Sequence, residues 1–530
     1  MRRTKSLLLC LCFLAVLGHG ICGTVLVVLV PGPTSHLFNM RKLGSEIASR
    51  NHKIAYLAME GDAEKLQPTM IPIIRYTISS STSGGPTSLA NLTVVGAQSM
   101  RSMMTLLHHL GTSCDALMQN ASVIAQIKDL APEVLVGTSM YPCLQVLSSK
   151  LELPFVNFLP AGPIDPMFDN IWRGANYRAP LPNPLSYLPQ MGMPAASQHL
   201  SFPQRLRNAF HYVAVKVMGH TTMGPLSMAT LRRHGVDPDA RVERERCALT
   251  ICAADFAVEW LRPLPPSLKF VGPLLPEPAR PLPTDLEDFM NSAGGQGVLL
   301  VATGTVATLG PKERLAMAAT FAKLPLKVLW KLSKGEVPDE AALAELNLGS
   351  NTKVVSWLPQ NDVLGHRQTR AFLSHCGANS MYEAAYHGVP IIGLPFFADQ
   401  PGNADKAVAK GFAVRISHGD LTGDGLLKAA LEVLSNPKYA TAAAGVSVKL
   451  RARKRTPVQE AIDWVEHVLA TRGEAYLRTP DEDLSWLARM GLDVLAAYLG
   501  ALCLLAYLSW RLTSAVIRAA WRKLAKLKRS

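Results

Sequence analysis

The chain has 530 residues, of which 48% are hydrophobic and 18% are charged. This balance excludes a disordered chain for most of its length, and the length predicts two or three domains. The formal net charge is +14, but residues 1–10 contribute +3 and residues 511–530 contribute +7, which leaves +4 for everything between them. An excess of positive charge that is concentrated at the two ends argues against a nucleic-acid-binding surface and indicates membrane topology.

Both ends of the chain have the pattern of membrane-targeting segments. Residues 1–23 combine a basic start, an apolar run and small residues, which predicts a cleaved signal peptide; an uncleaved anchor or a first core strand are the alternatives. Residues 494–510 are uncharged and apolar, which predicts a transmembrane helix that follows a juxtamembrane helix start at 481–493. The basic tail 511–530 would then be cytosolic and the body of the protein lumenal.

Short motifs favour a location in the endoplasmic reticulum membrane. Lys526 and Lys528 have the spacing of a dilysine retrieval signal, and Asn91–Thr93 and Asn120–Ser122 are glycosylation acceptor triplets on the predicted lumenal side. The chain has no Walker loop and no GxGxxG, HExxH or CxxC motif, which excludes most ATPases, dehydrogenases and zinc hydrolases. The cysteines of the body are too few and too scattered for a disulfide framework or a zinc cluster: Cys114, Cys143, Cys247, Cys252 and Cys376.

From Thr24 onward, the sequence alternates between predicted strands and predicted helices. The apolar run 24–30, the periodic stretch from Ser35 to Ile47 and the run 53–59 predict one βαβ unit. A second unit is expected from a strand at 133–139, a helix at 141–151 and a strand at 154–159. Residues 160–205 are rich in Pro, Gly and Asn, which predicts irregular structure that builds a binding surface.

A proline-rich stretch, 270–283, then separates the chain into two halves. We expect an N-terminal domain at 24–275, a linker at 276–283 and a C-terminal domain at 284–480. The second half repeats the alternating pattern, with strands at 297–304, 327–332, 371–375 and 389–395 and helices at 312–322 and 379–387. Two parallel-sheet domains would bind a ligand between them, at the carboxyl ends of their strands.

The polar segment His375–Ser380 connects a predicted strand to a predicted helix, so backbone N–H groups and the helix dipole favour an anion there. His375 and Ser380 add donors for a pyrophosphate. Glu383, one turn later, has acceptors for a diol such as a ribose, and Trp357 offers a flat face for a base. Asp399 and Gln400 suit sugar hydroxyls. Together these residues predict a nucleotide-sugar site.

The spacing of these residues resembles the signature of the UDP-glycosyltransferases, the membrane-bound glucuronosyl- and glucosyltransferase family of the endoplasmic reticulum. The order of signal, two domains, linker, late span and basic tail agrees with that family. The resemblance implies an α/β GT-B fold, with two Rossmann-like parallel-sheet domains and a C-terminal transmembrane helix. The N-terminal domain would bind the acceptor and the C-terminal domain the UDP-sugar, which is a co-substrate, so we expect no cofactor and no metal.

The resemblance also implies a role for each residue of the predicted donor site. Trp357 would stack on uracil, Gln360 and Glu383 would hold uridine, His375, Gly377 and Ser380 would meet the phosphates, Asn379, Asp399 and Gln400 would approach the sugar, and Gly304 and Thr305 would lie beside the diphosphate. UDP-glucuronate, UDP-glucose and UDP-galactose all remain open as donors. Homo- and hetero-oligomers are common in the family and are possible assemblies here.

The predicted catalytic residue is His36, which follows the first strand and resembles the acceptor-activating base of the family. Such a base implies inverting transfer of a hexosyl or hexuronosyl group to a small lipophilic acceptor. The family places an Asp in a stretch that ends in Pro-Cys, and the register of Pro142-Cys143 puts Thr138 at that position. Three interpretations follow: His36 acts unaided on acidic phenols or amines, another acid substitutes, or the protein is a catalytically weak or inactive UDP-sugar-binding homologue.

Overall fold

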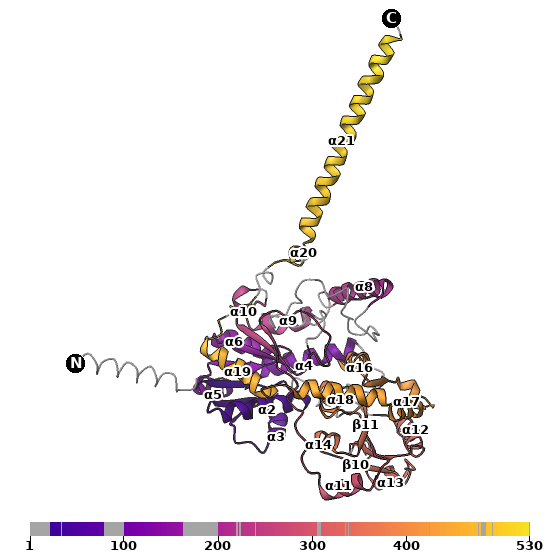
Figure 1. Cartoon of the computed structure of the whole chain (residues 1–530). Helices are drawn as coiled ribbons and strands as arrows, with labels where there is room; N and C mark the ends of the chain where they lie inside the picture. Colours follow the sequence, from indigo (N-terminus) through magenta and orange to yellow (C-terminus); the bar gives the residue numbers. More distant parts are fainter. Residues whose placement is uncertain are drawn as a thin grey trace, which may run out of the picture.

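The structure is a computed structural model, in which two parallel sheets form a two-lobed body and a long helix projects from it (Figure 1). It describes residues 22–32, 34–78, 100–162, 200–218, 221, 224–238, 240–304, 309–333, 335–337, 339–422, 424–474, 476–478, 484–489 and 491–528. The predicted signal peptide up to residue 21, the acceptor triplet at Asn91, Thr305 and most of the predicted irregular segment, 163–199, lie outside these residues. The end of that segment is helical, because α8 begins at Phe202.

The first sheet has the strand order β3-β2-β1-β4-β5-β6-β7, with all neighbours parallel. Its strands are β1 (Thr24–Val28), β2 (Lys53–Met59), β3 (Ile73–Tyr76), β4 (Val134–Gly137), β5 (Phe155–Leu159), β6 (Cys247–Cys252) and β7 (Leu268–Phe270). The helices among them are α2 (Thr34–Ser49), α3 (Glu60–Leu66), α4 (Met100–Gln119), α5 (Ala121–Leu130), α6 (Pro142–Leu151), α8 (Phe202–Met218), α9 (Gly224–Arg233) and α10 (Arg241–Glu245). Both predicted βαβ units are confirmed.

The second sheet has the order β10-β9-β8-β11-β12-β13 and is also parallel. Its strands are β8 (Val298–Ala302), β9 (Lys327–Lys331), β10 (Thr352–Val355), β11 (Thr369–Ser374), β12 (Ile391–Gly393) and β13 (Ala413–Arg415). Its helical segments are α11 (Thr284–Asn291), α12 (Pro311–Phe321), α13 (Glu340–Ala344), α14 (Gln360–Gly365), α15 (Ala378–His387), α16 (Gln400–Ala409), η4 (His418–Thr422), α17 (Gly425–Ser435), α18 (Pro437–Arg451) and α19 (Pro457–Ala470).

Continuous apolar runs form the strands because helices cover both faces of each sheet. Along β1, Val25 and Val27 belong to the core on one face, and Leu26 and Val28 belong to the core on the other. Residues of β8 alternate between two cores in the same way. Burial on both sides removes the polar positions that a half-exposed strand would show, which is why these strands are readable as unbroken apolar segments.

One helix of the second half packs in the core of the first sheet. α19 lies within the range 284–480 that we predicted for the second domain, yet Ile462 and Val465 are buried in the same cluster as Val25. Arg50 at the end of α2 donates to Asp463 at 2.7 Å and to Glu466 at 2.9 Å. The chain therefore crosses between the lobes a second time after α18, and α19 holds them together.

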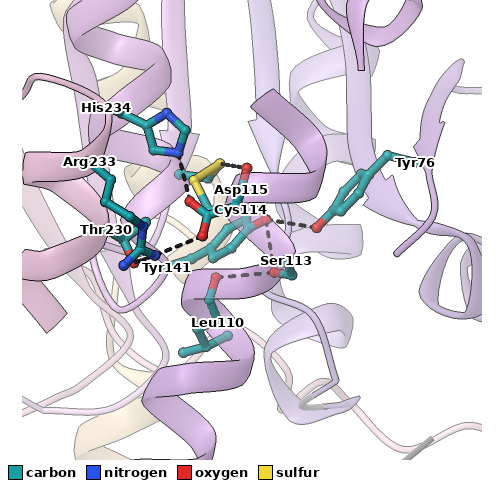
Figure 2. Close-up of a disulfide and its surroundings, with 10 residues drawn as sticks. Tyr76, Leu110, Ser113, Cys114, Asp115, Tyr141, Thr230, Arg233 and His234 are labelled. Atoms are coloured by element: carbon teal, nitrogen blue, oxygen red, sulfur yellow. Dashed lines mark hydrogen bonds and ion pairs between the residues drawn. A yellow bond between two sulfur atoms is a disulfide. The ribbon is translucent and has the colours of Figure 1, made fainter. Parts of the chain in front are cut away.

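A disulfide joins Cys114 of α4 to Cys143 at the start of α6 (Figure 2). Beside it, the hydroxyls of Tyr76 and Tyr141 lie 2.8 Å apart, and Ser113 Oγ donates to Tyr141 Oη at 3.2 Å. The bridge and this hydrogen-bond cluster secure the turn that follows β4, next to the carboxyl end of β1. The scattered cysteines of the sequence did not predict this pairing, because it depends on how α4 packs against α6.

The C-terminal helix leaves the body after the short helix α20 (Trp486–Arg489) (Figure 1). α21 runs from Leu492 to Leu527 without a break, and its residues 492–525 are long and apolar enough to cross a membrane. It is longer than the predicted span 494–510, because the basic tail continues the same helix.

Candidate active site

The predicted phosphate-binding loop lies between β11 and α15. β11 ends at Ser374 and α15 begins at Ala378, and Cys376 between them has a φ of 61°. Gly377 is the N-cap residue and provides no side-chain cap. Backbone N–H groups at the start of α15 are therefore presented where an anion is electrostatically favoured.

The imidazole of His375 packs closely against two glycines. A Cβ atom added to Gly377 would lie 2.5 Å from His375 Nε2, and one added to Gly304 would lie 2.9 Å from the same atom. Gly304 also has a φ of +95°, which side chains rarely adopt. Burial lowers the pKa of His375 to about 4, so the ring is neutral at pH 7. The structure brings Gly304, His375 and Gly377 together, as the resemblance implies.

Replacing Gly377 with Ala is expected to weaken UDP-glucose binding about tenfold, because overpacking by one methyl group costs about 1–3 kcal/mol and displaces the His375 ring. The φ of Gly377 is −59°, so the substitution adds no backbone strain. Calorimetric titration of the purified full chain measures the affinity. Gly402→Ala is the control, because a Cβ there meets nothing within 4 Å. Equal affinities for the two variants would contradict the packing role of Gly377.

Three of the predicted uridine and phosphate residues form one hydrogen-bonded group. Gln360 Nε2 at the start of α14 donates to Ser380 Oγ at 3.0 Å and to Glu383 Oε2 at 2.5 Å, both on α15. Burial raises the pKa of Glu383 to about 7, although the Gln360 hydrogen bond opposes this shift. Trp357 has 68% of its surface exposed, so its face is open to stacking. Glu383 is therefore half protonated near neutral pH when no ligand is bound.

Lys331 is a charged neighbour of this group that the sequence analysis did not select. It ends β9 beside Ala302 of β8. Burial has the largest effect on the pKa of both His375 and Glu383, and the charge of Lys331 adds a smaller downward contribution to each. The same burial lowers the pKa of Lys331 itself. An ammonium group there complements an anionic ligand at the start of α15. The sequence signal was a lysine directly after the apolar residues of a predicted strand, at its carboxyl end.

The predicted sugar residues lie at the start of α16. Asp399 accepts from Asn403 Nδ2 at 2.6 Å and from the backbone N–H of Ala378, while burial raises its pKa. Gln400 Oε1 accepts from the backbone N–H groups of Phe396 and Phe397 at 2.8 and 3.2 Å, so this oxygen holds the preceding loop. Asp399 thus joins the start of α16 to the start of α15.

An ion pair between the two lobes lies next to the residues that are predicted to approach the sugar. Lys406 Nζ lies 2.8 Å from Glu259 Oε1, which belongs to the first lobe and is 1% exposed. Lys406 Nζ also donates to Asn403 Oδ1 at 3.4 Å, and Asn403 in turn holds Asp399. Neither residue belonged to the predicted site, because they are 147 positions apart and carry no local motif.

The double variant Glu259→Gln with Lys406→Met removes both charges, and we expect it to weaken UDP-glucose binding about tenfold while UDP binding changes little. The reason is that the ion pair supports Asp399 at the sugar end and does not contact the Gln360 group. Competition titrations with the two ligands measure the two affinities. A purely structural role of the pair would weaken both ligands equally and would contradict this prediction.

The predicted base, His36, lies in the first turn of α2. Its Nδ1 atom is buried and has no hydrogen-bond partner among the residues that the structure describes, and burial lowers its pKa to about 4. One turn later, Asn39 Nδ2 donates to Asn379 Oδ1 at 3.2 Å. Asn379 belongs to the first turn of α15, so this hydrogen bond joins the helix of the predicted base to the helix of the predicted phosphate site.

Thr138 follows β4 and is 1% exposed. Its Oγ1 accepts from the backbone N–H of Met140 at 3.3 Å, and its carbonyl accepts from Tyr141 N–H at 3.0 Å. Val28 of β1 pairs with Gly137, so Thr138 lies at the same sheet edge as the segment that leads to His36. A threonine there supplies no charge that would raise the pKa of His36.

Comparison with known proteins decides the family. Residues 23–528 match the family model described as "UDP-glucoronosyl and UDP-glucosyl transferase". The chain belongs to this family. The glycosyltransferase is 31% identical over 512 residues to UDP-glucuronosyltransferase 2A3 of Cavia porcellus, with 92% of each chain covered. It is 29% identical to UDP-glucuronosyltransferase 2A1 of Mus musculus, with 93% of each covered.

Solved structures confirm the GT-B fold of this glycosyltransferase. The structure of UDP-glucose: anthocyanidin 3-O-glucosyltransferase in complex with UDP has a TM-score of 0.59 at 20% identity, covering 85% of this chain and 99% of that one. Os79 from O. sativa in complex with UDP has a TM-score of 0.58 at 17% identity, covering 84% and 100%. The family and the GT-B fold are therefore established for this glycosyltransferase.

Proposed function

We propose that the protein is an inverting UDP-glycosyltransferase in which His36 is the general base. The neutral imidazole accepts the proton of an acceptor hydroxyl while that oxygen attacks the anomeric carbon. The bond from this carbon to the diphosphate breaks on the opposite face, and UDP leaves with the bonding electrons. The Asn39–Asn379 hydrogen bond carries the proposal, because it brings the start of α2 to the start of α15.

The low pKa of His36 supports a particular class of acceptor. With a pKa near 4 the imidazole is neutral at pH 7 and available, but it is a weak base. A weak base accepts a proton efficiently only from an acidic group, so acidic phenols are favoured over aliphatic alcohols as acceptors. We infer a small lipophilic acceptor with an acidic hydroxyl, or an amine that needs little deprotonation.

The donor and the location are further parts of the proposal. We infer that the transferred group is a hexosyl or hexuronosyl group, in line with the names of the relatives. The single apolar helix among the described residues and the basic tail after it support a lumenal body, a cytosolic tail and residence in the endoplasmic reticulum membrane. Homo- or hetero-oligomers through the membrane helix are compatible with this arrangement.

A second candidate function is UDP-sugar binding without turnover. The uncharged Thr138 and the unpartnered Nδ1 of His36 favour it, because no described group stabilises an imidazolium at His36. The predicted donor residues belong to the second lobe, so binding of UDP-sugar would persist without a working base.

A panel assay distinguishes the two candidates. Membranes that contain the full chain are given UDP-glucuronate, UDP-glucose or UDP-galactose with substituted phenols, steroids and amines, while UDP-glucose binding is measured in parallel. We expect turnover that is fastest with the most acidic phenols. Saturable UDP-glucose binding with no product from any pair, in the parent and in Thr138→Asp alike, would reject the enzyme and leave the binding homologue.

A further inference from the structure

α8 presents an apolar stripe to solvent. Phe202, Leu206, Phe210, Val213 and Val217 are between 51% and 75% exposed. At about 100° per residue their positions cover an arc of about 80° around the helix axis. On the other side of the helix, Asn208 is fully buried. Single exposed apolar residues are ordinary, but a continuous stripe of five on one helix marks an interaction surface.

The charges of α8 indicate which kind of partner would bind its apolar stripe. The helix contains no Asp or Glu, and Arg205 and Arg207 are both exposed. Each lies about 100° from the centre of the stripe, on opposite sides of it. An apolar face bordered by arginines is typical of a helix that lies in the interface of a bilayer, with its apolar face among the acyl chains and its cations at the anionic headgroups.

The position of α8 agrees with that geometry. Figure 1 shows α8 at the end of the body from which α20 and α21 emerge, running across the direction of α21. Other helices at this end also expose apolar side chains, namely Leu226 of α9, Val242 of α10 and Leu487 of α20. Among the described residues, α21 is the helix long and apolar enough to cross a membrane, and a bilayer around it would face this end.

We propose that α8 is a second membrane contact, which lies flat in the bilayer interface beside the point where α21 enters. The partner is the lipid surface itself, with a preference for anionic headgroups. α21 anchors the chain, and α8 sets the orientation of the body. If the proposed function holds, the consequence is that a lipophilic acceptor reaches the first lobe from the bilayer and not from water.

Spin labelling of the full chain in nanodiscs tests the contact without any use of activity. The label is attached through Phe210→Cys, with the exposed Cys22 and Cys503 replaced by Ser. Met70→Cys is the matched control, because Met70 is apolar and 99% exposed but follows α3, away from this end. We expect the label at 210 to be accessible to oxygen and protected from an aqueous nickel chelate, and the label at 70 to behave oppositely. Phosphatidylserine in the nanodisc should increase the protection at 210.

Two results would overturn the proposal. One is a label at 210 that is as accessible to the aqueous nickel chelate as the label at 70. The other is close contact between the labels of two copies without oxygen access, which would assign the stripe to a second copy of the chain.

Activity then tests the acceptor route separately. With Leu206→Glu and Phe210→Glu combined, the KM for a bilayer-partitioned acceptor should rise about fivefold or more, while the KM for UDP-sugar stays unchanged. An unchanged acceptor KM would reject the route. Absence of turnover in the parent would count against the proposed function, and the label result would still decide the membrane contact.

Discussion

Replacing His36 with Ala is expected to lower kcat/KM for transfer by roughly 10²–10⁴-fold, the usual contribution of a general base. The affinity for UDP-glucose should not change, because His36 belongs to α2 of the first lobe and the predicted donor residues belong to the second lobe. Initial rates with an acidic phenol and calorimetric titration with UDP-glucose measure the two quantities. Full activity in the variant would remove His36 from the mechanism.

Thr138→Asp provides the gain-of-function counterpart. The family resemblance places at this position the Asp that orients the base, and a carboxylate there would raise the pKa of His36 and stabilise its protonated form. We therefore expect kcat/KM at pH 7 to rise by about tenfold or more. The pH dependence of activity provides an independent test. The neutral imidazole is the active form, so activity of the parent should fall only as the pH drops towards about 4, and in Thr138→Asp it should fall at a higher pH. Thr138→Asn, which has the same size without charge, should leave the profile unshifted.

UDP-glucose should bind about tenfold more tightly at pH 8 than at pH 6, because a folded-state pKa near 7 leaves Glu383 mostly protonated at the lower pH. An ionised carboxylate is the stronger acceptor for the two ribose hydroxyls that the family resemblance assigns to it. UDP-glucose is the right probe, because its diphosphate does not itself titrate in this range. Calorimetry in buffers of different ionisation enthalpy should detect proton release on binding at pH 7.

Glu383→Gln is the control for this pH dependence, and it should bind weakly with no change between pH 6 and pH 8. The stability of the ligand-free protein should depend on pH in the opposite sense to UDP-glucose binding. The folded pKa of Glu383 is raised above its unfolded value of 4.5, so this residue destabilises the ligand-free protein as the pH rises from 4.5 through 7. At pH 8 the Gln variant should therefore be more stable by roughly 2–4 kcal/mol, measured by chemical unfolding. Binding that depends equally on pH in both proteins would assign the titration to another group.

Much of the donor site was predictable because its parts are local in sequence. A strand, an anion-binding loop and the first turn of a helix occupy consecutive residues up to Glu383, and their spacing alone orients their side chains. Lys331 was missed because a single lysine at a strand end has no spacing pattern. Its relevance depends on β9 pairing with β8, which places it beside His375 and Glu383.

Local sequence patterns are enough to predict the parallel-sheet architecture, the donor signature and the apolar C-terminal helix, because each is encoded by a run or a period within a few dozen residues. The contacts between the two lobes depend instead on how the whole chain packs. The Asn39–Asn379 hydrogen bond and the Glu259–Lys406 ion pair join residues 340 and 147 positions apart, and α19 returns to the first sheet. No local pattern specifies such pairs, since they form only when whole lobes pack together. The same holds for the stripe on α8, whose exposure depends on what the rest of the body leaves uncovered.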